Sequence, residues 1–205
     1  MARIFRVSAR ATMTGFLEPI ARRLLRAGIS PNAVTVAGTI GVLIGALGFA
    51  ARGHLIPAVI IIGVSSFTDM LDGTMARISG GTTKFGAFLD SSMDRVADAA
   101  IFGALTYWFA VSGDRWDAVA ALLCLVTGQL VSYVKARAEG LDISCNVGIA
   151  ERPERLLIVG LGALLGGLTL DWALSAALWL LAVLSAITVG QRVRHVYVQT
   201  RGAVG

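Results

Sequence analysis

The chain has 205 residues, of which 56% are hydrophobic and 15% are charged, and its formal net charge is +5. A soluble domain carries roughly 25% charged residues, so this sequence has too few polar groups to cover a water-exposed surface. Disorder is excluded by the apolar composition, and a disulfide-rich secreted scaffold by the presence of only two cysteines. The length predicts an all-α, polytopic membrane protein with about six spans of around 20 residues each.

The first 29 residues form a basic segment, for which we predict a cytoplasmic arm and an interfacial amphipathic helix. Its apolar residues recur at helical spacing on one side, and its charged residues share the other. The apolar positions are Phe16, Leu17, Ile20, Ala21, Leu24 and Leu25, and the charged positions are Glu18, Arg22, Arg23 and Arg26. This pattern is typical of a helix lying in the membrane interface, with a solvated basic arm as the alternative. A cleaved signal peptide is not expected, because the first fifteen residues contain no apolar core.

Six apolar segments follow and predict six transmembrane helices within one domain, residues 30–199, with a short tail at 200–205. The segments cover approximately residues 34–51, 55–67, 85–111, 118–134, 156–170 and 172–189. The pairs Gly41/Gly45 and Gly162/Gly166 fit the small-xxx-small spacing of closely packed membrane helices.

The positive charges of the chain lie almost entirely on one predicted side of the membrane. That side, which includes both termini, holds 16 of the 18 lysines and arginines, while the other holds only Arg52 and Arg115. The positive-inside rule therefore places both termini on the cytoplasmic side of the cell membrane. The net charge is explained by this orientation, and no nucleic acid is expected as a partner.

Four aspartates occur where the second and third predicted spans meet a short cytoplasmic turn. Asp69 and Asp72 are three residues apart, and Gly86, Asp90 and Asp94 follow each other at intervals of four on one helix face. An antiparallel hairpin brings the four carboxylates together, where they repel each other unless cations lie between them. Carboxylates are the ligands that Mg²⁺ prefers, so the pattern favours a two-metal site that holds a pyrophosphate.

Two other interpretations of these acids are open. A cation or proton transporter also uses intramembrane acids, but here they cluster at one end of the spans rather than lining a path. Asp98, one turn beyond Asp94, favours the transporter most, and we expect it instead to stand behind the metal ligands. Simple pairing of helix-end acids with arginines is disfavoured, because the spacing places acids beside acids.

The string D-x2-D-G-x2-A-R-x8-G-x3-D-x3-D, from Asp69 to Asp94, resembles the signature of the CDP-alcohol phosphotransferases. These enzymes join a CDP-linked lipid to an alcohol and release CMP. The resemblance implies a six-span homodimer in which Asp69, Asp72, Asp90 and Asp94 bind two Mg²⁺ ions (or Mn²⁺). It further implies that Asp94 is the general base. The implied contacts to CDP-diacylglycerol are Asn32, Thr35, Gly73, Arg77 and Thr83.

A second group of polar residues lies at the cytoplasmic ends of the fourth, fifth and sixth predicted spans, in residues 132–139 and 151–155 and at Arg192 and Arg194. Arginine binds phosphate with two parallel hydrogen bonds, so this group favours an anionic acceptor, although ordinary positive flanking is the alternative. The strings K-A-R-A-E and E-R-P-E-R-L resemble the actinobacterial phosphatidylinositol phosphate synthases within that family. This resemblance implies inositol phosphate as acceptor, with glycerol 3-phosphate (phosphatidylglycerophosphate synthase) as the runner-up. The implied acceptor contacts are Ser132, Lys135, Arg137, Arg152, Arg155 and Arg194.

Two neighbouring residues compete with Arg194 for the role of acceptor contact. Arg192 and His195 flank Arg194 and fit the same place at the end of the sixth span. The loop at 140–150 shows no recognisable pattern.

Overall fold

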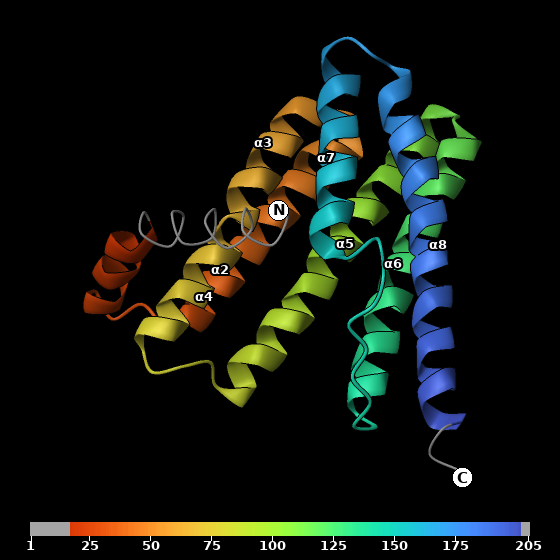
Figure 1. The fold of residues 1–205 in the computed structure, drawn as a ribbon. Helices are drawn as coiled ribbons and strands as arrows, with labels where there is room; N and C mark the ends of the chain where they lie inside the picture. Colours follow the sequence, from red (N-terminus) through yellow and green to blue (C-terminus); the bar gives the residue numbers. More distant parts are fainter. Residues whose placement is uncertain (1–16, 202–205) are drawn as a thin grey trace, which may run out of the picture. The chain divides into compact units, whose positions relative to one another are not determined.

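The computed structural model describes residues 17–201, and these form helices joined by short loops without any strand (Figure 1). Residues 17–26 are helical, and the later helices are α2 (Pro31–Leu43), α3 (Leu55–Ser66), α4 (Thr68–Ile78), α5 (Lys84–Ser112), α6 (Arg115–Glu139), α7 (Arg152–Leu168) and α8 (Trp172–Arg201). A π-helical segment (Ile44–Phe49) and a 3₁₀ turn (Ala50–Arg52) continue α2. The all-α prediction is confirmed. The rest of the predicted basic arm and tail, including Phe16, lies outside the described residues.

The chain separates into two compact units. Of the described residues, the first unit comprises 17–44 and 61–97, and the second comprises 45–60 and 98–201. The helix α5 is shared, because its first half belongs to the first unit and its second half to the other.

A small apolar core holds the first unit together. Ala21, Val34 and Met75 are buried at its centre, so the helix at 17–26 packs against α2 and α4. The three arginines of that helix are exposed. The helix α2 is capped at its start, since the side chain of Ser30 accepts a hydrogen bond from the Ala33 amide at 3.2 Å and Pro31 occupies the first helical position.

The second unit is built on α8, which packs along both α6 and α7 (Figure 1). Gly162 of α7 lies directly against α8, because a Cβ atom there would stand 2.4 Å from the Cβ of Ala177. Gly166 follows one turn later and also faces α8, since a Cβ atom there would stand 3.5 Å from the Cβ of Leu174. The close packing predicted for this glycine pair is therefore present.

Four helical stretches in the described chain are long and apolar enough to cross a membrane: Pro31–Arg52, Leu55–Ile78, Arg115–Glu139 and Trp172–Arg201. The remaining two predicted spans do not meet this description. The first half of α5 carries several charged residues, and α7 has only 17 residues. Length and composition thus support a multi-span membrane protein with four clear candidates.

The contrast between two glycines of α7 gives a test of this packing. Gly162→Ala places a methyl group inside the van der Waals contact with α8, whereas Gly160→Ala meets open space. We expect Gly162→Ala to destabilise the protein by about 1–3 kcal/mol, the usual cost of overpacking. Thermal unfolding in detergent measures both variants, and Gly160→Ala should melt no lower than wild type. Equal melting of the two would contradict the packing.

Candidate functional site

The four signature aspartates all belong to the first unit, two on α4 and two on α5. Asp72 is only 6% exposed and accepts a short hydrogen bond from the Thr35 hydroxyl of α2. The negative charges of Asp69 and Asp90 both act on the Asp72 carboxylate. The structure therefore brings acids from both helices, together with the predicted ligand-binding residue Thr35, into one region.

These carboxylates have the chemistry of a divalent-cation site. Among residues 17–201, no three histidine, cysteine or acidic side chains are already gathered around one point. The donor set nevertheless consists only of carboxylate oxygens, which suit hard ions such as Mg²⁺ or Mn²⁺. Asp94 also lies 3.8 Å from the guanidinium of its neighbour Arg95.

Two residues predicted to contact CDP-diacylglycerol, Asn32 of α2 and Thr83 before α5, both lie close to Gly86. The Thr83 hydroxyl accepts a hydrogen bond from the Gly86 amide at 2.9 Å and caps this helix. A Cβ atom on Gly86 would stand 3.2 Å from Asn32 Oδ1 and 3.1 Å from Thr83 Oγ1. The absence of a side chain at Gly86 thus lets the beginnings of α2 and α5 approach.

The predicted residues Gly73 and Arg77 lie on the exposed side of α4. A Cβ atom at Gly73 would meet nothing within 4 Å, so packing in the described structure does not require a glycine there. Glycine inside a helix costs about 1 kcal/mol relative to alanine. An open helix face beside the buried Asp72 is what close approach of a ligand needs. Arg77 donates to the Thr74 hydroxyl at 3.0 Å.

All six predicted acceptor contacts belong to the second unit. Arg152 and Arg155 stand in the first turn of α7, and both form ion pairs with Asp98, at 3.2 and 2.8 Å. On α6, the Ser132 hydroxyl donates to the Gly128 carbonyl at 3.3 Å, and Lys135 lies 3.9 Å from Glu139. Arg137 is exposed.

Sequence reasoning misses the role of Arg192, which it leaves as a competitor of Arg194. Arg192 is only 3% exposed and donates to the carbonyls of Val147 and Val131, at 2.8 and 2.6 Å, and to Glu151 at 3.0 Å. It therefore fixes the loop at 140–151 against α8 and is unavailable to an acceptor. The Thr188 hydroxyl, one turn earlier, accepts the Ala150 amide at 3.1 Å. The signal in the sequence is the spacing of Thr188 and Arg192, two polar residues four positions apart in an apolar span, which places both on one buried face of the helix.

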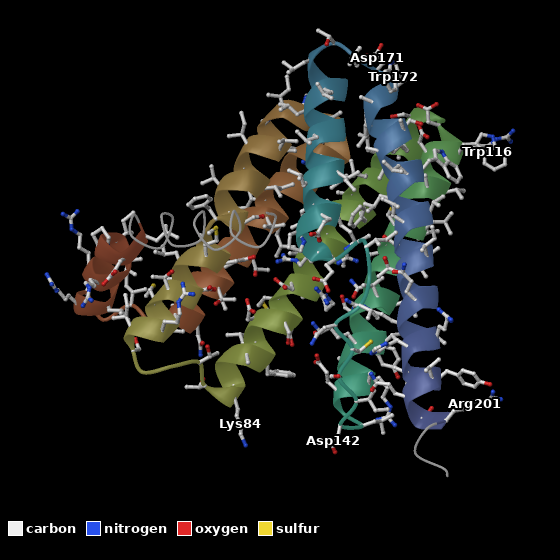
Figure 2. The ribbon with its side chains drawn as sticks, in the orientation of Figure 1. Lys84, Trp116, Asp142, Asp171, Trp172 and Arg201 are labelled. Carbon is white, nitrogen blue, oxygen red and sulfur yellow. The ribbon has the colours of Figure 1, made fainter. Side chains whose placement is uncertain are left out.

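Arg194, in contrast to Arg192, is exposed. With Gln191 and His195 of α8 and Gly148 of the loop, it lines an open groove of about 530 Å³. Within this unit, Figure 2 shows Asp142 and Arg201 at one end, and Trp116, Asp171 and Trp172 at the opposite end. The loop after α6 and the end of α8 thus share one end of the unit.

Comparisons with known proteins show the family to which the chain belongs. Residues 28–189 match the family model described as CDP-alcohol phosphatidyltransferase. The chain belongs to the CDP-alcohol phosphatidyltransferase family. The acid signature, from Asp69 to Asp94, lies within the matched region.

Relatives within this family carry a more specific name. The phosphatidylinositol phosphate synthase of Mycobacterium marinum is 47% identical over 193 residues, covering 92% of this chain and 82% of the relative. That of Mycobacteroides abscessus is 45% identical over 190 residues, covering 92% and 86%. That of Corynebacterium glutamicum is 44% identical over 181 residues, covering 86% and 81%.

Solved structures from the family match the fold closely. The crystal structure of Mycobacterium tuberculosis phosphatidylinositol phosphate synthase with CDP-DAG bound has a TM-score of 0.86 and 45% identity, covering 88% of this chain and 93% of that one. The same enzyme in complex with manganese and citrate has a TM-score of 0.85 and 44% identity, covering 88% of each chain.

The two arginines near the end of α8 are predicted to behave differently when replaced. Arg192→Gln leaves buried carbonyls without their donor, at a cost of roughly 1–3 kcal/mol for each unsatisfied group. We expect its melting temperature to fall by several degrees, while Arg194→Gln, a change at an exposed side chain, should melt like wild type. Calorimetry or a dye-based melting assay in detergent measures both, and equal melting temperatures would refute the structural role of Arg192.

Proposed function

We propose that this chain is a phosphatidylinositol phosphate synthase. It transfers the phosphatidyl group of CDP-diacylglycerol to a hydroxyl of inositol phosphate and releases CMP. The observation that carries the proposal is the complete acid signature, Asp69 to Asp94, in a chain about 45% identical to enzymes of that name over nine tenths of its length. The membership of a transferase family disfavours the transporter alternative.

We assign the divalent-cation site to Asp69, Asp72, Asp90 and Asp94. Its support is the all-carboxylate donor set in one unit, together with the manganese complex of a structural relative. When bound, such cations neutralise the pyrophosphate and make CMP a better leaving group. Mg²⁺ is our choice among them, because it binds carboxylates and phosphates together. Thr35 orients Asp72 by the hydrogen bond between their side chains.

The transfer itself needs a base, and we assign this role to Asp94. The acceptor hydroxyl oxygen attacks the phosphorus that carries the diacylglycerol, and the bond from that phosphorus to the CMP oxygen breaks. The hydroxyl proton passes to Asp94 as the new bond forms. Asn32, Gly73, Arg77 and Thr83 are our contacts for CDP-diacylglycerol, supported by the open face of α4 and by the CDP-DAG complex of a relative.

The acceptor site is proposed at the basic end of α6, α7 and α8. Ser132, Lys135, Arg137, Arg152 and Arg194 are our direct contacts, and they favour a phosphate-bearing alcohol over a neutral one. Glycerol 3-phosphate carries the same charge and remains the competing acceptor.

For the membrane arrangement, we propose two spans beyond the four that length and composition support. We propose that α5 and α7 complete a bundle of six spans, since 17 residues of α7 already reach about 25 Å. Both termini and the active site lie on the cytoplasmic side, as the distribution of arginine and lysine favours. The helix at 17–26 lies in the interface with its arginines toward lipid headgroups, and two copies form a homodimer.

The acceptor assay tests the proposed function directly. Purified protein receives labelled CDP-diacylglycerol and Mg²⁺ with inositol phosphate, glycerol 3-phosphate or free inositol, and released CMP is measured. We expect release with inositol phosphate, loss of release with EDTA and restoration by Mg²⁺ or Mn²⁺. Release with glycerol 3-phosphate alone would instead support the runner-up. Ion flux in sealed vesicles without nucleotide, and no CMP with either phosphate, would make the chain a transporter.

Asp94→Asn is the companion variant for the same assay. It keeps the size of the side chain but removes the proton acceptor, so CMP release should fall roughly 10²- to 10⁴-fold. Asp117→Asn is the matched control, because Asp117 is a carboxylate of α6 that accepts a hydrogen bond from Ser175 at 2.6 Å, away from the signature in sequence. Undiminished release by Asp94→Asn would remove Asp94 from the role of base.

A further inference from the structure

One buried carboxylate of the second unit is outside the acid signature. The side chain of Asp98 is 5% exposed and divides its two oxygens between two arginines of α7. Its Oδ1 accepts a hydrogen bond from Arg152 Nε at 3.2 Å, and its Oδ2 accepts one from Arg155 Nη2 at 2.8 Å. A single acid from α5 thus holds both arginines of the first turn of α7.

The two arginines differ in their access to solvent. The side chain of Arg155 is 2% exposed, while that of Arg152 is 20% exposed. The helix α6 makes room for Arg155 at Gly128, where a Cβ atom would stand 2.3 Å from Arg155 Nη1. Arg155 is therefore enclosed by the protein, and we place it behind the direct acceptor contacts rather than among them. Arg152 reaches the surface.

The geometry points to Asp98 as the positioning residue of the acceptor site. It neutralises Arg155 inside the unit, and by holding Nε of Arg152 it fixes the plane of that guanidinium for the phosphate of the acceptor. This inference rests on the proposed function. A guanidinium is planar, so a hydrogen bond at Nε restricts the whole group. Orienting Arg152 before the acceptor arrives removes part of the entropy cost of binding.

The position of Arg152 and Arg155 at the start of α7 explains why an acid is needed beside them. Two positive charges in the first turn of a helix oppose the helix dipole, and Asp98 offsets this repulsion. A buried pair is stable only while both partners remain. Packing alone needs no such pair, because apolar residues of similar volume often serve equally well. The hydrogen bond to the partly exposed Arg152 therefore indicates a role beyond packing.

The test compares Asp98→Asn with the double variant Asp98→Asn/Arg155→Met, using CMP release at varied acceptor and varied CDP-diacylglycerol. Asp98→Asn should raise the KM for the acceptor roughly 10- to 100-fold and leave the KM for CDP-diacylglycerol unchanged. It should also lower the melting temperature by on the order of 10 °C, because the buried Arg155 loses its ion pair with Asp98. In the double variant the melting temperature should recover, because methionine removes the buried charge, while the acceptor KM should stay high.

Recovery of the acceptor KM together with the melting temperature would overturn the inference and leave Asp98 a purely structural role. An equal rise of both KM values would overturn it too. Asp117→Asn is the control carboxylate in the same unit, and it should change neither KM. Wild type is assayed first with inositol phosphate and glycerol 3-phosphate. A preference for glycerol 3-phosphate refutes the proposed acceptor, and the Asp98 comparison then proceeds with that substrate.

Discussion

A charged side chain inside an apolar protein needs an opposite charge or a polar partner beside it, and much of this structure follows from that requirement. Asp72 has the Thr35 hydroxyl, Arg192 has backbone carbonyls and Glu151, and Asp98 has two arginines. Each of these contacts joins segments that are far apart in the sequence. The sparse charges of the chain thus connect its helices as well as provide its chemistry.

The helices and the acid signature could be predicted from the sequence because both depend on local spacing. The four-residue interval from Asp90 to Asp94 defines one helix face, and Ser30 before a proline marks the start of α2. The partners of charged residues could not be predicted in this way. Asp98 and Arg155 are 57 residues apart, and local periodicity does not determine which helix faces which. The space that Gly128 leaves for Arg155 also depends on which helices pack together, which local periodicity does not determine.

The structure also divides arginines that look alike in the sequence. Arg155 and Arg192 are enclosed and hold protein groups, whereas Arg152 and Arg194 reach the surface. A phosphate-bearing acceptor needs arginines that are accessible but already oriented, since each free rotation lost on binding reduces affinity. In the proposed acceptor site, Arg155 binds Asp98 and Arg192 binds the loop at 140–151, while Arg152 and Arg194 stay accessible to the phosphate.

The interruption at Phe67 divides one apolar stretch into α3 and α4. Although Leu55–Ile78 is long enough to cross a membrane, its more apolar half ends before the helix that carries Asp69 and Asp72 begins. Membranes differ in thickness, and a helix responds by tilting. Phe67 itself keeps helical backbone angles (φ −67°, ψ −22°), so α4 continues nearly in the direction of α3, and a tilt of the stretch moves the carboxylates of α4 with it. Asp69 and Asp72 are therefore held at one end of a helical stretch of membrane length, and their position follows that of the whole stretch.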